Sequence, residues 1–448
     1  MSRRISALLL SLLLLLSGCK RVVETIGTPQ SPAEQPEKQA VAAITLPYDE
    51  NAGLDPLTTT SRYNLELGAL LYEPLVGLAS GMEPSGGLAE SVEVSGNVVT
   101  LRLRSPVAAQ VADILNRIRT GATNFSARLK SVTDVAVAGD STLVVTLTAP
   151  DAGFPAMLNI PMSCAPGLYT LSEGRLVANG GAALREIGLL SIHSDEEAAY
   201  AYRSGGATVV TGMMGMQGKQ YATNNLVFLG TTLKNAALRK AISAAINRTE
   251  LIDDNLSISG YVALSPVHPD WYLYDPYAVL HGFDAGYAKE QLGGATPKLR
   301  LLVCSDSSEK LTIAQSIAFQ LKSVGIETEI TEADKAAYLS ALERRDFDLY
   351  LGEVKLTPDM DLTPLCGTGG ALNYGGLSIP AVDDALAAFK AQGGRELAKA
   401  LMETLDAECP VIPLYFVQKG VAAPVPVLDV LTPTAVNPLS GIENVAVG

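Results

Sequence analysis

Residues 298–330 hold the stretch that decides the fold, reading KLRLLVC at 298–304, LTIAQSIAFQLKSV at 311–324 and IETEI at 326–330. In the first segment, Leu299, Leu301 and Val303 alternate with other residues and predict a buried strand. The second segment predicts an amphipathic helix that ends at Gly325, and the third predicts another strand. A strand, a helix and a strand in this order resemble a parallel crossover of a doubly wound sheet.

Strand and helix signals alternate along the rest of the chain, which favours the α/β class. Hairpins are predicted at 92–103 and 132–147, where polar turns separate apolar arms. Further helices are predicted at 107–118, 236–246, 336–345, 382–392 and 396–408, with another strand at 348–351.

The N-terminus has the pattern of a bacterial lipoprotein signal. Arg3 and Arg4 precede the apolar run 5–16, which is too short to span a membrane, and Leu-Ser-Gly at 16–18 precedes Cys19. We expect cleavage before Cys19 and lipidation of its thiol, followed by a disordered, proline-rich tether. The alternative is an ordinary secretory signal with a chance cysteine. The lipoprotein interpretation places the protein on the extracytoplasmic face of the cell membrane.

Charge and hydropathy restrict the class of partner. The 448 residues carry a formal charge of −14, and removal of Arg3 and Arg4 with the signal makes it −16. Such acidity argues against nucleic acid, which needs a basic footprint, although a merely soluble acidic surface explains the value equally well. No other run approaches membrane-spanning length, and the length predicts two or three lobes.

The remaining cysteines, Cys164, Cys304, Cys366 and Cys409, are isolated along the chain. None belongs to a C-x-x-C motif, and no histidine stands at metal-ligand spacing, so we expect neither a metal site nor a cofactor. We expect buried thiols, although an extracytoplasmic location would permit a disulfide.

Short motifs follow one another in the order of a known family. They are LDPL at 54–57, LYEPLV at 71–76, LAES at 88–91, TLRLR at 100–104, TLVVTLTAP at 142–150, GLY at 167–169, LRKAI at 238–242 with AINR at 245–248, VGI at 324–326, DFDL at 346–349 and PVIPLY at 410–415. This set resembles the family 5 extracellular solute-binding proteins of ABC importers, which are the oligopeptide-, dipeptide- and nickel-binding type.

The resemblance implies a two-lobed, periplasmic-binding-protein-like fold of type II, with a hinge between the lobes and a small extra subdomain. The implied division is a signal peptide at 1–18, a tether at 19–43, lobe I at 44–229 with the subdomain at about 67–150, lobe II at 230–413 and a return to lobe I at 414–448. It also implies a monomer that is not an enzyme. Such a protein closes on a small solute, most often a peptide, and delivers it to a membrane permease with ATPase subunits.

Two departures from the family bear on the ligand. The loop that usually follows the TLRLR strand is deleted, because residues 104–109 lead almost directly into a helix. In peptide-binding members an acidic residue pairs with the peptide's α-ammonium, and Leu356 occupies that position here. Leucine cannot neutralise an ammonium, whereas the neighbouring Lys355 would favour an anionic group.

Several residues are candidate ligand contacts. Asp359 and Asp361 follow a strand end, where open α/β sheets bind ligands, so they could pair with a ligand cation or could cap the turn. Asn373 and Tyr374 resemble a cleft segment of the family, and Tyr374 could stack on a ligand or pack within a loop. The single tryptophan, Trp271, could face the ligand or anchor its loop.

No catalytic motif for a hydrolase, metalloprotease or nucleotide-binding enzyme occurs in a convincing context. A hydrolase would require a triad around His193, His268 or His281. A sensor or interaction lipoprotein that kept the fold but lost the ligand remains an alternative, which Leu356 and the deleted loop favour. Importers of metal chelates or oligosaccharides share the family and are further alternatives.

Overall fold

The computed structural model describes residues 41–213, 218–253 and 259–448. The signal sequence and Cys19 lie outside the described residues. Within the described residues, no helix is both long and apolar enough to cross a membrane.

The crossover predicted at 298–330 is confirmed. Strand β14 (Lys298–Cys304) pairs in parallel with β15 (Glu327–Ala333), and helix α8 (Ser308–Ser323) connects them. The helix begins three residues earlier than predicted, because the Ser307 hydroxyl accepts a hydrogen bond from the Lys310 amide and caps it. Gly325 then takes a φ of +97°, which glycine adopts without a steric penalty and which ends the helix.

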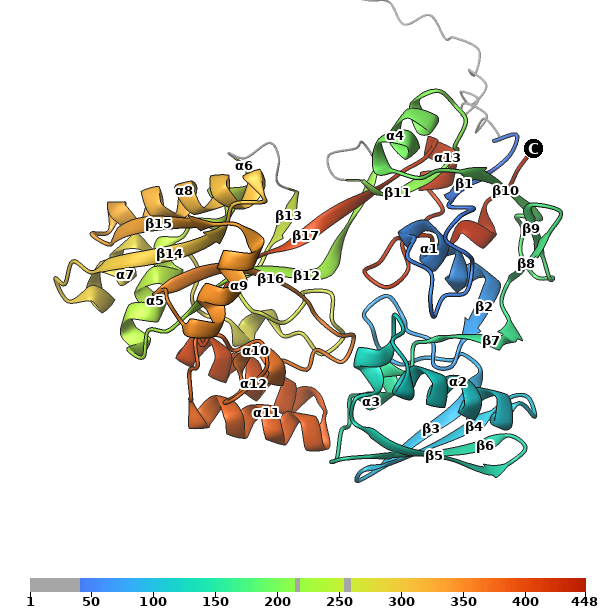
Figure 1. The fold of residues 1–448 in the computed structure, drawn as a ribbon, viewed down its shortest axis with the longest axis horizontal. Coiled ribbons are helices and arrows are strands. Elements are labelled where there is room, and N and C mark those ends of the chain that lie inside the picture. The colour runs from blue at the N-terminus through green and yellow to red at the C-terminus, as the bar shows by residue number, and fades with distance from the viewer. Residues whose placement is uncertain (1–40, 214–217, 254–258) are drawn as a thin grey trace, which may run out of the picture. The chain divides into compact units, whose positions relative to one another are not determined.

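These two strands belong to the largest sheet (Figure 1). Its order is β11-β17-β12-β16-β14-β15, with β13 paired to β17. The remaining bounds are β11 (Val210–Met213), β12 (Lys219–Thr231), β13 (Gly260–Val262), β16 (Leu349–Lys355) and β17 (Ile412–Ala422). Parallel pairing joins β14 to β15 and β16, whereas β12 is antiparallel to both of its neighbours.

Helices cover both faces of the β14–β16 region. Leu301 and Leu349 pack in one hydrophobic cluster with α5, α7 and α8, whereas Leu302 and Tyr350 pack in another with α9, α11 and α12. Successive residues of a strand point to opposite faces, so adjacent leucines serve different clusters. The bounds are α5 (Ala236–Ala245), α6 (Arg248–Asp253), α7 (Ala285–Leu292), α9 (Lys335–Arg344), α10 (Thr363–Cys366), α11 (Pro380–Gln392) and α12 (Arg395–Glu408).

The N-terminal half contributes three smaller sheets. The hairpins predicted at 92–103 and 132–147 are confirmed as an antiparallel sheet of order β3-β4-β6-β5, and α2 packs on it. A second sheet has the order β1-β10-β9-β8, and β2 pairs with β7. The bounds are β1 (Thr45–Tyr48), α1 (Arg62–Leu71), β2 (Tyr72–Pro74), β3 (Ala89–Ser95), β4 (Val98–Leu103), α2 (Ala108–Thr120), β5 (Val132–Gly139), β6 (Thr142–Leu147), α3 (Phe154–Met157), β7 (Pro161–Pro166), β8 (Tyr169–Ser172), β9 (Arg175–Ala178), β10 (Glu186–Ser191) and α4 (Asp195–Arg203), with α13 (Val425–Leu428) near the C-terminus.

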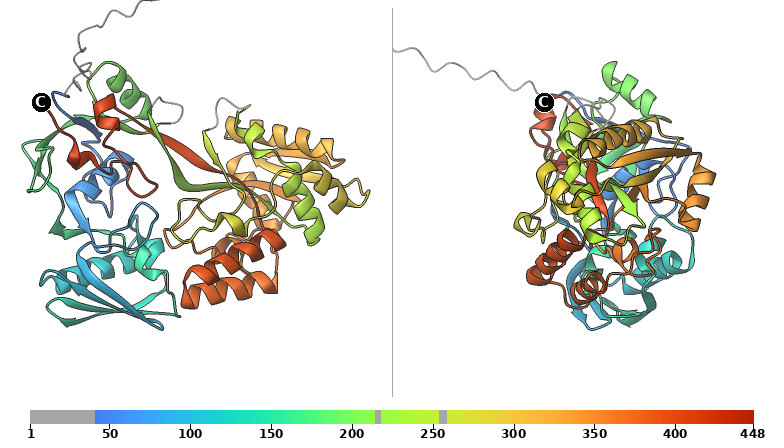
Figure 2. Two further views of the ribbon diagram at one scale, coloured as in Figure 1. Left: turned by 180° about the vertical axis from the view of Figure 1, so that it is seen from behind. Right: turned by 90° about the vertical axis from the view of Figure 1, so that its left-hand side faces the viewer.

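Strands β12 and β17 run side by side along their lengths (Figure 2). They pair from Lys219 to Ala222 and again from Leu226 to Leu229, with an irregularity between the two stretches. Val421 packs with the β1-β10 sheet, whereas Phe416 packs with α12. The same two strands therefore contribute to two separate cores. The lobe boundaries predicted from the sequence, 229/230 and 413/414, fall inside β12 and β17 respectively.

Candidate functional site

Lys355 ends β16 and lines a cavity of about 250 Å³, together with Lys419 of β17 and Arg62 of α1. We call it the basic cavity. Its other lining residues are Leu65, Glu66, Ala69, Tyr221, Thr223, Asn224, Asn225, Ala435, Val436, Asn437 and Pro438. The Arg62 guanidinium lies 2.8 Å from an Asp195 oxygen and 3.4 Å from a Glu66 oxygen. Lys355 has no such ion pair with any described residue.

Asp361 is held by Lys390 of α11, whose ammonium also lies 3.7 Å from an Asp151 oxygen. The Asp361 carboxylate accepts a further hydrogen bond from the Thr363 amide at 2.9 Å. Burial would raise the pKa of Asp361, but the hydrogen bond and charge of Lys390 outweigh burial and lower it. The Asp361 carboxylate thus caps its own turn and also forms an ion pair with Lys390.

Asp359 is 6% exposed and has no lysine or arginine within ion-pairing distance among the described residues. Burial raises its pKa to about 6, and the negative charges of Asp361 and Asp151 contribute to the rise. A hydrogen bond from Thr357 opposes these effects. Asp359 is therefore the member of the predicted pair that keeps a carboxyl group without a cationic partner.

Trp271 lines a cavity of about 180 Å³ that Asp359 also lines. Its ring packs edge-to-face on Tyr272 and Phe389, with both centroid separations at 5.6 Å. The indole nitrogen is buried and has no hydrogen-bond partner among the described residues. Both interpretations of Trp271 thus have a structural counterpart, because the ring is a packing anchor and also borders a cavity with a carboxyl group.

Asn373 braces its own loop. Its amide nitrogen donates to the Gly367 and Leu377 carbonyls at 2.9 and 2.8 Å, and its oxygen accepts from the Leu377 amide at 3.2 Å. These bonds occupy both ends of the side chain. The described contacts therefore give Asn373 a loop-bracing role.

Tyr374 lines a separate cavity of about 290 Å³. Its ring stands nearly perpendicular to that of Tyr350, with the centroids 6.1 Å apart. Phe228 and Tyr338 line the same cavity. Tyr374 and Trp271 thus border different cavities, and the structure does not bring them together.

Met82 joins two parts of the chain, and no sequence motif predicted this role. Met82 lies between β2 and β3 and takes a φ of +63°. It is 1% exposed and packs in the hydrophobic cluster that contains residues of α9, α11 and α12. A left-handed conformation is uncommon for methionine and marks a position fixed by its surroundings. Next to it, the Tyr272 amide donates to the Gly81 carbonyl at 2.9 Å. The glycines at 77, 81, 86 and 87 are the only sequence signal of this loop.

A second contact between these parts involves Lys390. The Ala152 amide donates to the Lys390 carbonyl at 2.8 Å, in addition to the approach of the Lys390 ammonium to Asp151. Gly153 favours the close approach at this contact, because a Cβ there would lie 3.0 Å from the Cβ of Asp359 and the neighbouring backbone or side chain would have to shift. The loop after β6 and the loop after β16 are therefore in direct contact.

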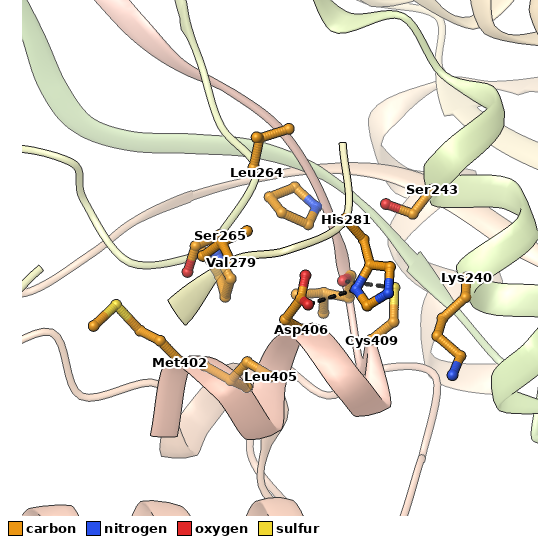
Figure 3. Close-up of a pocket in the computed structure, with 13 residues that line it drawn as sticks. Lys240, Ser243, Leu264, Ser265, Val279, His281, Met402, Leu405, Asp406 and Cys409 are labelled. Atoms are coloured by element: carbon orange, nitrogen blue, oxygen red, sulfur yellow. Dashed lines mark hydrogen bonds and ion pairs between the residues drawn. The ribbon is translucent and has the colours of Figure 1, made fainter. Parts of the chain in front are cut away.

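The histidine and cysteine of a fourth cavity do not form a catalytic site. Figure 3 shows His281 turned toward Asp406 of α12, with Nδ1 2.5 Å from a carboxylate oxygen, and Cys409 lies beside them. Burial raises the pKa of the Cys409 thiol to about 11, so the thiol stays protonated at neutral pH and is a poor nucleophile. The cavity of about 20 Å³ has room for about one water.

The four cysteines in the described part of the chain are free thiols. Cys366 and Cys409 are buried as predicted, but Cys164 and Cys304 are only half-buried. Cys164 packs at the margin of the cluster that contains α2, and Cys304 is the last residue of β14 and lines the cavity of Tyr374. Among the same residues, no three histidine, cysteine, aspartate or glutamate side chains gather as metal ligands.

Residues 175–372 match the model of the bacterial extracellular solute-binding proteins, family 5 middle. No curated protein matches the chain in sequence.

Solved structures match nearly the whole chain. HbpA2 from Haemophilus parasuis is 17% identical with a TM-score of 0.75, covering 89% of this chain and 98% of its own. MppA, a periplasmic murein tripeptide binding protein in an unliganded open form, is 17% identical with a TM-score of 0.76, covering 91% and 96%. The oligopeptide-binding protein AppA from Bacillus subtilis, in complex with a nonapeptide, is 16% identical with a TM-score of 0.61, covering 92% and 99%.

At such identities the structures show a shared fold, and the family model supplies the sequence match. The motifs quoted above extend the resemblance on both sides of residues 175–372. The family is one of binding proteins rather than enzymes, in keeping with the protonated Cys409 thiol. Residues 175–372 are therefore similar to the bacterial extracellular solute-binding proteins of family 5, and the chain shares its fold with these solved structures over about nine-tenths of its length.

Proposed function

We propose that this protein is the lipid-anchored solute-binding component of an ABC importer, which captures a solute between two lobes and delivers it to a permease. The observation that carries the proposal is the basic cavity, because elements of two separate cores line it. Arg62 comes from α1, next to the β1-β10 sheet, and Lys355 comes from β16 of the large sheet. A solute in this cavity would touch both sides of the irregularity in β12 and β17, so its binding would favour one arrangement of the two cores.

Peptides are the solute class that we propose first. MppA and AppA are described as binding a murein tripeptide and a nonapeptide, and their fold is shared with this chain. Leu356 is 6% exposed, which leaves little of its side chain for a ligand, and its amide donates to the Asn224 carbonyl at 2.8 Å. Asp359 lines the cavity of Trp271 and not the basic cavity, so it would serve a peptide ammonium only if the solute reached both cavities.

The alternative is a sensor or interaction lipoprotein with the same fold. The observation that favours it is the short connection between β4 and α2, where four residues replace the longer family loop. A solute such as a metal chelate or an oligosaccharide is the other alternative within transport.

Native mass spectrometry tests the proposal. The mature protein, purified without denaturation from cells grown in peptide-rich medium, is expected to carry a set of bound peptide masses that mild unfolding releases. Bound masses of another chemical class would support the importer function and contradict peptides as the solute class. An empty protein that shows no thermal shift with a peptide panel would reject solute capture and support the sensor.

The lipid anchor has its own test. Replacing Cys19 with alanine is expected to release a folded protein from the membrane fraction, because the acyl chains would provide the attachment. Detergent phase partitioning measures this release, with Cys164→Ala as the control that keeps the anchor. Retention of the Cys19→Ala protein in the membrane fraction would contradict the lipoprotein interpretation.

A further inference from the structure

We propose that the basic cavity binds an anionic group of the solute, a carboxylate or a phosphate, through the ammonium groups of Lys355 and Lys419. This inference names the solute chemistry and rests on the proposed solute-binding function. It assigns Lys419 and the hydroxyl of Tyr221 to the site alongside Lys355. Nothing in the sequence marks these two residues.

The acidic side chains around the cavity already have partners. The Glu66 carboxylate bonds to the Arg62 guanidinium and to the Thr211 hydroxyl. Glu353 bonds to Asn225 at 2.9 Å and to Lys310 at 3.1 Å. Each carboxylate therefore has a nearer cation or donor than the two lysines of the cavity.

The two lysines are left with an excess of positive charge. Arg62, Lys355 and Lys419 carry three positive charges, whereas Glu66 in the lining and Asp195 beside Arg62 carry two negative charges, so the cavity keeps a net positive charge. The side chain of Lys355 still reaches solvent, yet desolvation by the surrounding protein lowers its pKa, and the charges of Arg128 and Lys419 lower it further. An anion between the lysines would relieve this repulsion, which is a direct source of binding free energy.

Neutral donors complete the site. The Tyr221 hydroxyl lines the cavity and has no hydrogen bond to the described residues, and burial raises its pKa so that it keeps its proton. The Asn224 side chain also lines the cavity, but its buried amide oxygen is an acceptor with no partner among the described residues, so it adds no donor for an anion. A phenol that can donate and two ammonium groups match the oxygens of a carboxylate or phosphate.

The chain as a whole makes this local charge unusual. With a formal charge of −14, the protein repels anions over most of its surface. A cavity whose two lysines form no ion pair within 4.0 Å with the described residues is therefore a selective feature within an acidic molecule. Its position beside the irregularity in β12 and β17 would let the anion contact Lys355 in one core and Tyr221 near the other.

Titration with two simple anions tests the site directly. The full chain with its lipid anchor removed by Cys19→Ala is titrated with inorganic phosphate and with glutarate at constant ionic strength, and binding is followed by calorimetry. We expect saturable binding of at least one anion to the unaltered cavity. The double variant Lys355→Met with Lys419→Met should bind at least tenfold more weakly, because two charge-assisted contacts are lost.

A matched control separates the site from net charge. The variant Lys289→Met with Lys322→Met removes the same charge from exposed positions on α7 and α8 and should bind like the parent. Tighter binding of phosphate would indicate that the solute carries a phosphate group. Tighter binding of glutarate would indicate that it carries a carboxylate group. Failure of both anions to bind, or equal affinity in the two double variants, would overturn the proposal.

The same protein distinguishes this inference from the proposed function. If the protein without the lysine substitutions binds an anion but captures no solute from rich medium, the importer function is contradicted and the anion site is supported. If the protein captures a solute that has no acidic group, the anion site is contradicted and the importer function is supported.

Discussion

Replacing Asp359 with asparagine is expected to raise the free energy of unfolding by about 2–3 kcal/mol at pH 7.5. The buried carboxyl has its pKa raised from 3.8 to about 6, so the folded state holds a proton that the unfolded state releases. The folded protein consequently loses stability as the pH rises from about 4 to about 6, and an ionised Asp359 remains a cost above that window. Asparagine removes this cost and keeps the shape of the side chain. Urea unfolding at pH 7.5 and at pH 4 measures the gain, which should shrink at the lower pH.

Asp361→Asn is the matched control, two residues away in the same turn. Its pKa is lowered in the folded state because the effect of Lys390 exceeds that of burial, so the ionised form is stabilising at neutral pH. This contribution is lost as the pH falls through the lowered pKa. The control should therefore destabilise the protein at pH 7.5, opposite in sign to Asp359→Asn. Equal destabilisation by both variants, or a gain at Asp359 that does not vary with pH, would contradict the assignment.

Replacing Arg239 with methionine is expected to lower the free energy of unfolding by about 3–5 kcal/mol, as breaking a buried charged network does. Arg239 is 2% exposed, and its guanidinium donates to the carbonyls of Leu233, Lys234, Glu408 and Cys409. Two of these carbonyls belong to the C-terminal end of α12, where the helix has no partners of its own. Methionine would remove the donor from all four carbonyls, of which that of Cys409 is in a buried hydrogen bond and the others are part-buried.

Urea unfolding measures this loss, and Lys240→Met on the next position of α5 is the control. Lys240 has no ion pair with the described residues, so its replacement should change stability by less than about 0.5 kcal/mol, as is usual for such sites. Anion binding should survive Arg239→Met under conditions where the protein is folded. A loss of stability similar to that of the control would show that Arg239 does not join α5 to α12.

Local patterns accounted for most of the elements. The crossover at 298–330 was predictable because it depends on local patterns, namely the alternation of apolar residues in β14 and the apolar face of α8. The start of α8 was missed because a serine cap outweighs the apolar pattern. The family motif around Arg239 and Arg248 was visible in the sequence, but its role was not, because both guanidinium groups donate to carbonyls that lie far along the chain.

The site was less predictable, because its electrostatics depend on contacts between distant segments. Asp359 and Asp361 look equivalent in the sequence, and only Lys390 on α11 makes them differ. Lys355 was recognisable as a cation near the strand end, whereas its neighbour Lys419 is 64 positions later and reaches it only through the pairing of β12 with β16 and β17. Trp271 and Tyr374 could not be assigned to different cavities without coordinates.

The position of β17 in the large sheet also has a consequence for biosynthesis. This strand comes near the C-terminus, yet it lies between β11 and β12 and also pairs with β13. A growing chain emerges from the ribosome N-terminus first, so β11, β12 and β13 must wait for residues 412–422 before the sheet can be completed. Folding of the two cores is therefore postponed until synthesis is almost finished. Removal of the last strand by a protease would take buried side chains from both cores at once, Phe416 from one and Val421 from the other.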